Sequence, residues 1–213
     1  MNGVLRTEPF SRYHRRYDQW FESHWAAYAS ELLAVRTLLP TTGLGLEIGV
    51  GTGRFAAPLS VEYGIDPVPE MLPYARARGV RVVCAAAEVL PFPDRAFDYV
   101  LIVTTLCFVK DPQAMLREAA RVLRPRGKIV IGFIDQLSPL GQQYLAHRAH
   151  SPFYREARFY SVGEVRNLLR EAGFSGASWV QTLRTPLAQI KAVEGVSAGT
   201  GKGAFLVVRA QRP

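Results

Sequence analysis

The stretch Gly45–Phe55, GLEIGVGTGRF, decides the fold, because it places four glycines and one acid within a short apolar run. Glycine has no Cβ atom, so a cluster of glycines allows another group to approach the backbone closely. The apolar residues predict a short buried strand, and the glycines predict a tight turn after it. A strand followed by a glycine-rich turn is the arrangement that binds nucleotides in open α/β sheets.

Strands and helices alternate on either side of this turn. Apolar runs predict further strands at residues 62–66, 80–87, 97–106, 128–135, 177–183 and 203–210. Helical patterns cover residues 69–79, 112–123 and 162–172, and residues 54–61 are predicted to form a helix or a helical turn interrupted at Pro58. This alternation predicts an α/β sheet with helices on both faces.

Capping residues mark the ends of two of these helices. Asp111 is a predicted N-cap, and Pro112 suits the first helical position. Ser161 and Glu164 have the spacing of a capping box, and Gly173 marks the end of that helix.

The N-terminal segment predicts one or two helices over residues 10–40. It is rich in aromatic residues and then in Ala and Leu, and Pro40 with the following Thr-Thr-Gly ends it.

The composition fits a globular enzyme rather than a nucleic-acid-binding protein. Hydrophobic residues make up 48% and charged residues 21% of the 213 residues. The net charge of +8 comes mostly from Arg residues that are spread along the chain, and scattered Arg fits a solvated surface better than a phosphate-tracking stripe. We therefore expect no nucleic-acid partner.

The chain has no predicted membrane span, signal peptide or metal site. No apolar run reaches the roughly 18 residues of a membrane span, and the N-terminus lacks the apolar core of a signal peptide. Cys84 and Cys107 do not indicate a disulfide framework, and the four histidines are too dispersed to predict a metal site. We expect a cytoplasmic protein, either a monomer or a homodimer.

The glycine spacing discriminates between nucleotide cofactors. A dinucleotide fingerprint reads G-x-G-x-x-G, and its third glycine leaves room for a pyrophosphate. Here Gly49, Gly51 and Gly53 run G-x-G-x-G, and Arg54 occupies the position of that third glycine. The carboxylate of Glu47 would be unfavourable beside a pyrophosphate, whereas it would suit a ligand that carries an ammonium group.

Asp66 ends the next predicted strand, and its position indicates that the ligand also contains a ribose. An acid at this position can accept hydrogen bonds from both ribose hydroxyls, although it could instead cap the following helix. A nucleoside with a ribose, an amino-acid end and no phosphate is S-adenosylmethionine. We therefore predict S-adenosylmethionine as the cofactor, with S-adenosylhomocysteine as the product.

Four motifs in this order resemble a known family. The segments LEIGVGTGRF, YGIDPVPEML, AAAEVLPFPDRAFDYV and RVLRPRGKIVI are similar to those of class I S-adenosylmethionine-dependent methyltransferases of the small-molecule, type 11 kind. The resemblance covers residues 43–135 closely. It implies a Rossmann-like, doubly wound sheet of seven strands, mostly parallel with an antiparallel last strand, and a cofactor across the carboxyl ends of the first, second and fourth strands.

The resemblance also implies roles for individual residues. Glu47 and the three loop glycines would surround the methionyl part, and Asp66 would hold the ribose. The remaining cofactor contacts would be Met71 near the adenine, the Ala87 backbone and Glu88 at the adenine amine, and Thr104, Thr105 and Phe108 on the methyl-bearing side. The family often has an acid where this chain has Ala86, so the adenine amine contact departs from the family pattern.

Two aromatic segments outside these motifs are candidates for binding the methyl acceptor. They lie near the N-terminus and after the fifth predicted strand, and most of their aromatic residues are expected to pack the two segments together. A minority would form the roof of an enclosed, apolar substrate pocket, with Tyr13, Tyr17, Trp20, Tyr144 and Tyr154 as the candidates. No constellation of side chains identifies a catalytic base.

The sequence thus predicts one methyltransferase domain over residues 1–213. Its parts would be an N-terminal helical cap (1–42), a cofactor-binding core (43–135), a substrate-cap insertion (136–160) and a C-terminal helix with strands (161–213). The predicted function is methyl transfer to a small molecule. The alternatives are an RNA or protein methyltransferase, or a non-catalytic protein that binds S-adenosylmethionine.

Overall fold

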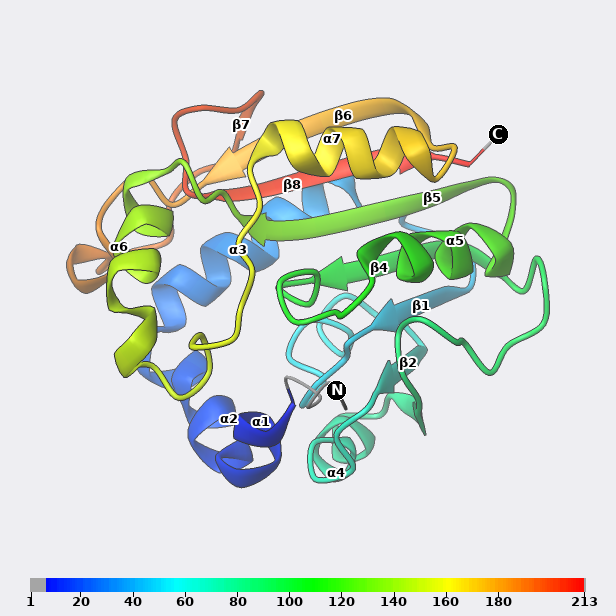
Figure 1. Cartoon of the computed structure of the whole chain (residues 1–213), viewed down its shortest axis with the longest axis horizontal. Helices are drawn as coiled ribbons and strands as arrows, with labels where there is room; N and C mark the ends of the chain where they lie inside the picture. Colours follow the sequence, from blue (N-terminus) through cyan, green and yellow to red (C-terminus); the bar gives the residue numbers. More distant parts are fainter. Residues whose placement is uncertain (1–6, 213) are drawn as a thin grey trace.

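A single twisted sheet runs through the molecule in the computed structural model, which describes residues 7–212 (Figure 1). The strands lie in the order β3-β2-β1-β4-β5-β8-β6-β7. Their bounds are β1 Gly45–Ile48, β2 Tyr63–Asp66, β3 Arg81–Cys84, β4 Phe97–Val103, β5 Leu123–Ile134, β6 Ser175–Thr182, β7 Ser197–Ala198 and β8 Phe205–Gln211.

The sheet confirms the predicted doubly wound α/β fold and corrects the strand count. The first five strands pair in parallel, and β8 runs antiparallel to both β5 and β6. The sheet has eight strands rather than seven, because the two-residue strand Ser197–Ala198 pairs with the outer edge of β6. Two residues are too few to produce a periodic signal in the sequence.

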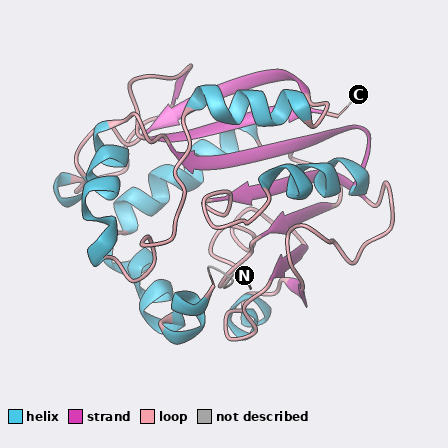
Figure 2. Ribbon diagram, viewed as in Figure 1, coloured by secondary structure: helices cyan, strands magenta, loops and turns pink. Residues whose placement is uncertain are grey.

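Helices cover both faces of the sheet (Figure 2). Their bounds are α1 Glu8–Arg12, α2 His14–Ser23, α3 Trp25–Leu38, α4 Leu72–Ala77, α5 Pro112–Val122, α6 Pro139–His147 and α7 Val162–Glu171, with 3₁₀ turns η1 Arg148–His150 and η2 Leu187–Gln189. One core contains α5, α7 and side chains such as Val100 and Ile102 of β4. The other contains α3, α4 and the alternate residues Leu101 and Val103. Alternating side chains of one strand therefore fill two cores.

The predicted caps are confirmed. The Asp111 side chain accepts a hydrogen bond from the Ala114 N–H at 2.9 Å. Ser161 and Glu164 form a reciprocal capping box, and Gly173 follows the helix with φ +85°. These features depend on neighbours in the chain, so local sequence predicts them.

Two local predictions need refinement. Residues 54–61 form successive hydrogen-bonded turns rather than an α-helix, because Pro58 has no N–H to continue the ladder. The N-terminal segment contains three helices instead of one or two, since the chain leaves helical geometry at Tyr13 and again at His24.

Three helices lie beyond the carboxyl end of the sheet. The arrows of β1, β4 and β5 point toward the side of the molecule that α1, α2 and α6 occupy (Figure 1).

Among residues 7–212, no helix is both long and apolar enough to span a bilayer.

Candidate functional site

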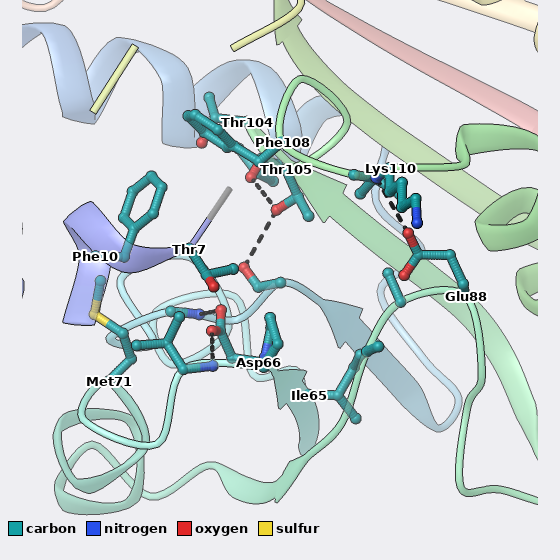
Figure 3. Close-up of a pocket in the computed structure, with 18 of the residues that line it drawn as sticks. Thr7, Phe10, Ile65, Asp66, Met71, Glu88, Thr104, Thr105, Phe108 and Lys110 are labelled. Carbon is teal, nitrogen blue, oxygen red and sulfur yellow. Dashed lines mark hydrogen bonds between the residues drawn. The ribbon is translucent and has the colours of Figure 1, made fainter. Parts of the chain in front are cut away.

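A cavity of about 300 Å³ lies at the carboxyl ends of β1, β2 and β4. Ligands bind at this edge in open α/β sheets. Its lining comes from the glycine-rich turn, the ends of β2 and β4, the segments after β2, β3 and β4, α1 with the residue before it, and Tyr17 of α2 (Figure 3). Apolar and aromatic side chains surround a few polar groups, which include Asp66, Glu88, Thr104 and Lys110.

The three turn glycines have different physical roles. Gly49 and Gly51 line the cavity, whereas Gly53 does not. A Cβ on Gly53 would lie 2.9 Å from the Ala75 backbone, so that glycine allows α4 to pack against the turn. A Cβ on Gly51 would have its nearest neighbour, Tyr17, at 3.6 Å, and its φ is +49°. Gly51 is therefore the glycine that leaves open space on the cavity side.

Asp66 connects the glycine-rich turn to the segment that follows β2. Its carboxylate accepts hydrogen bonds from the Gly51 N–H and the Val68 N–H, both at 2.9 Å. Burial raises the pKa of Asp66 to about 6, although these two hydrogen bonds oppose the rise. Each carboxylate oxygen has a second lone pair, so Asp66 can also accept hydrogen bonds from hydroxyls in the cavity.

Glu47 lies outside the cavity lining, beneath the turn. Its side chain is buried, and its Oε2 atom has no hydrogen-bond partner within residues 7–212. Burial raises its pKa well above the usual range, while a backbone hydrogen bond from Ala56 opposes this rise and the charge of Asp66 adds to it. Glu47 therefore accepts a hydrogen bond from the chain just after the glycines and does not line the cavity.

The segment after β3 forms another wall of the cavity. Ala86, Ala87 and Glu88 all line it, opposite the buried side chain of Met71. The Glu88 Oε1 atom accepts a hydrogen bond of 3.1 Å from the Lys110 N–H, as Figure 3 shows. No hydrogen bond to Glu88 Oε2 is formed by the described residues, so this oxygen is open to a ligand donor.

Thr104 follows β4 in a strained conformation. Its φ is +48°, which is uncommon for a β-branched residue. Its N–H donates to the Gly132 carbonyl at 2.8 Å, and the adjacent Thr105 hydroxyl lies 3.3 Å from the Gly49 carbonyl and 3.0 Å from the Val103 carbonyl. Strained backbone of this kind clusters at functional sites.

A second cavity, of about 410 Å³, adjoins the first. Nine Phe, Tyr and Trp residues line it, contributed by α1, α2, the turn after β1, the segment after β4, α6 and the loop after η1. Four residues line both cavities: Phe10, Tyr17, Thr104 and Phe108. Phe108 stacks on Tyr154 with ring centroids 6.1 Å apart and packs edge-on against Phe10 at 4.8 Å. The two cavities therefore meet at these four residues.

One acid lines the second cavity. Glu31 of α3 is 6% exposed. Burial raises its pKa to about 8. Neither the N-terminal composition nor the helical pattern distinguishes Glu31 from a surface glutamate, so the sequence analysis did not select it.

Charged residues fix α2 over the glycine-rich turn. Arg54 of the turn donates to both carboxylate oxygens of Asp18, and Arg78 donates to the same carboxylate at 2.9 Å and to the Thr52 carbonyl at 2.8 Å. Burial alone would raise the pKa of Asp18, but hydrogen bonds from the two arginines outweigh it and lower the pKa to about 2. This network holds Tyr17 and Trp20 of α2 beside the cavities.

The structure brings most of the residues selected from sequence into these two cavities. Gly49, Gly51, Asp66, Met71, Ala87, Glu88, Thr104, Thr105 and Phe108 line the first, and Tyr17, Trp20, Tyr144 and Tyr154 line the second. Glu47, Gly53 and Tyr13 line neither of them; the Tyr13 ring instead packs 6.3 Å from the Phe153 ring.

Sequence reasoning missed several lining residues. Those of the first cavity include Thr7, Phe10 and Lys110, and those of the second include Arg16, Glu31 and Phe55. In the sequence, the aromatic character of the N-terminal segment is the only feature that indicated any of these lining positions.

The chain is similar to proteins of the methyltransferase family. The model of the family described as Methyltransferase domain matches residues 46–131. A crystal structure of an S-adenosylmethionine-dependent methyltransferase, possible histamine N-methyltransferase, from Thermotoga maritima is 44% identical. It superposes with a TM-score of 0.95, covering 98% of this chain and 100% of that chain.

Two curated relatives extend the comparison. An uncharacterized protein of Methanocaldococcus jannaschii is 42% identical over 203 residues, which cover 95% of this chain and 98% of that protein. A demethylmenaquinone methyltransferase of Tropheryma whipplei is 29% identical over 196 residues, which cover 82% of each chain.

Proposed function

This chain belongs to the class I S-adenosylmethionine-dependent methyltransferases, and from this premise we propose that it methylates a small molecule bound in the second cavity. The observation that carries the proposal is the contact between the two cavities at Phe10, Tyr17, Thr104 and Phe108. Methyl transfer needs the acceptor atom in line with the sulfonium carbon, and water excluded from both. Adjoining cavities with an aromatic boundary meet this need.

The first cavity fits S-adenosylmethionine through its own residues. Gly51 leaves space for the methionyl part, and Asp66 would accept hydrogen bonds from the ribose hydroxyls. Met71, Ala87 and Glu88 would surround the adenine, with the open Oε2 atom of Glu88 in place of the acid that the family often has at position 86. When bound, S-adenosylmethionine supplies an already activated methyl group.

Glu47 and Gly53 enter this proposal as supports of the turn rather than as ligand contacts. Glu47 lies beneath the turn, and Gly53 packs against α4. Both would act by keeping Gly49 and Gly51 in position. Tyr13 would contribute through its packing against Phe153.

The dimensions and lining of the second cavity support a small acceptor. Its volume of about 410 Å³ falls within the range of roughly 300–1,000 Å³ typical of small-molecule sites. Seven of the described arginines form ion pairs with acids of the chain, which reduces the charge available for tracking a phosphate backbone. The names of two relatives point to different acceptors, demethylmenaquinone and histamine.

Calorimetric titration followed by an acceptor screen tests the proposal. The protein should bind S-adenosylmethionine and S-adenosylhomocysteine but not NAD, and mass spectrometry should detect methylated products from a small-molecule library. Binding of the cofactor without any transfer would favour the non-catalytic alternative. Methylation of RNA or protein substrates alone would favour the macromolecular one.

A further inference from the structure

The second cavity contains a buried acid that its surroundings leave without a partner. Glu31 projects from α3, and its side chain accepts no hydrogen bond and forms no ion pair with any other residue between positions 7 and 212. By comparison, the buried Asp18 accepts hydrogen bonds from Arg54 and Arg78. The Glu31 oxygens are not among the fully buried, unpaired side-chain atoms of the described residues, so they stay accessible from the cavity with their hydrogen-bonding capacity unused.

Such a position is energetically unfavourable unless something else compensates. A carboxylate that leaves water loses its hydration unless it becomes neutral or finds a partner, and even a neutral carboxyl group loses its hydrogen bonds to water when nothing replaces them. A glutamine or leucine of similar size would avoid this cost. The position of Glu31 therefore indicates that its partner is a ligand.

The aromatic rings around Glu31 restrict the charge of that ligand. Tyr17, Tyr144 and Tyr154 line the same cavity. Burial is the largest cause that raises the pKa of each, so the three phenols stay neutral. Neutral aromatic faces attract cations. An anion would meet both the carboxyl group and the negative ring faces.

We propose that the methyl acceptor is a small amine that binds as an ammonium ion, with its nitrogen at Glu31 among the tyrosine rings of the second cavity. Before transfer, the ammonium would donate a proton to the Glu31 carboxylate. The lone pair of the neutral amine would then bond to the methyl carbon as the S–C bond breaks, and S-adenosylhomocysteine would leave. This inference rests on the proposed function, and it narrows the acceptor to one chemical class. It also distinguishes between the acceptors named for the relatives, because a quinone carries no cation for Glu31 to bind.

Cation binding at Glu31 has a measurable effect on protonation. With a pKa of about 8, Glu31 is about nine-tenths protonated at pH 7 in the free protein. An ammonium ion favours the carboxylate, so its binding should release close to one proton. Arg16 of α2, His147 of α6 and His150 of η1 also line the cavity, and Arg16 is exposed to solvent there. Tyr28 of α3 lies close enough to Glu31 for its pKa to be raised by that charge.

Three probes of matched shape test the charge preference. Protein saturated with S-adenosylhomocysteine is titrated calorimetrically at pH 7 with 2-phenylethylamine, 2-phenylethanol and 3-phenylpropionate. We expect the amine to bind at least tenfold more tightly than the alcohol, as a charge-assisted contact predicts, and the carboxylate to bind weakest. The amine titration should also release close to one proton, read from heats in buffers of different ionisation enthalpy.

Two variants connect this preference to Glu31. In Glu31→Gln, the tenfold preference and the proton release should both disappear, while S-adenosylhomocysteine binds as in the wild type. Glu62→Gln, the same substitution at an exposed site, should retain both. If Glu31→Gln does not fold, Glu31→Leu provides the same comparison.

The outcomes separate this inference from the proposed function. Failure of the wild type to bind S-adenosylhomocysteine would overturn the proposed function. Normal binding of S-adenosylhomocysteine, together with equal or tighter binding of the alcohol or the carboxylate, would overturn the amine class alone. An amine preference that persists in both Glu31 variants would also overturn it.

Discussion

Asp18 of α2 and Arg54 of the glycine-rich turn form a bidentate ion pair, with Nε–Oδ1 at 2.8 Å and Nη2–Oδ2 at 2.7 Å. Arg54 occupies the position at which a dinucleotide-binding turn carries its third glycine. In this protein that position anchors the helix that carries Tyr17 and Trp20. The turn therefore lines the first cavity and also holds in place the helix whose aromatic side chains line the second cavity.

Breaking this ion pair should destabilise the protein more than breaking an exposed one. Both side chains are about one-seventh exposed, at 13% and 15%. In a double-mutant cycle with Asp18→Asn and Arg54→Met, we expect a coupling energy of about 1–3 kcal/mol from urea unfolding. The exposed pair Glu62–Arg81, at 3.7 Å, should give a much smaller coupling energy, because solvent screens both charges. Equal coupling in the two cycles would contradict the role of Asp18 and Arg54 as an anchor.

Substitutions at two glycines should separate binding from folding. Gly51→Val places a side chain on the cavity side, where the nearest atom of residues 7–212, apart from the two chain neighbours, lies 3.6 Å from the Cβ. It should abolish binding of S-adenosylmethionine and cost only about 1–2 kcal/mol of stability, through its positive φ. Gly53→Val should mainly destabilise the fold, because its Cβ would contact the Ala75 backbone at 2.9 Å. Calorimetry and thermal unfolding of both variants test this difference, and normal cofactor binding by Gly51→Val would refute it.

Asp66 should make cofactor binding dependent on pH. Its pKa is about 6 in the free protein, and only the carboxylate accepts hydrogen bonds from both ribose hydroxyls without donating. Affinity for S-adenosylhomocysteine should therefore fall as the pH drops through about 6 and level off above it. Asp66→Asn should weaken binding by about 2–3 kcal/mol and remove this dependence. The placement of the ribose at Asp66 fails if the folded variant binds with unchanged affinity.

Glu31 should lower stability at alkaline pH in the absence of ligand. Burial raises its pKa from 4.5 to about 8, so the folded state binds this proton more tightly than the unfolded state. The free energy of unfolding of the wild type should then decrease relative to Glu31→Gln as the pH rises from about 4.5 to about 8, by more than about 1 kcal/mol. Urea titrations at pH 5, 7 and 9 measure the difference. A constant difference across this range would mean that the Glu31 carboxyl is not desolvated.

Much of the fold was predictable from sequence, because the signals are local. The apolar runs at residues 97–106 and 128–135 predict central strands, and Asp111, Ser161 and Glu164 cap helices within the next few residues. The glycine spacing after β1 also distinguishes the cofactor class. Each of these signals depends on groups separated by a few positions in the chain, so no tertiary contact is needed to recognise them.

The tertiary structure alone decided which of these residues meet. Gly51 and Gly53 are two positions apart, yet one faces a cavity and the other packs on α4. Glu31 reads as an ordinary helical glutamate, and only the packing of α2, α6 and the loop after η1 encloses it beside a cavity. Burial, and with it the pKa of an acid, is set by groups distant in the chain. For that reason the sequence determined the methyltransferase family and its cofactor class, whereas the chemistry of the second cavity emerged only from the folded chain.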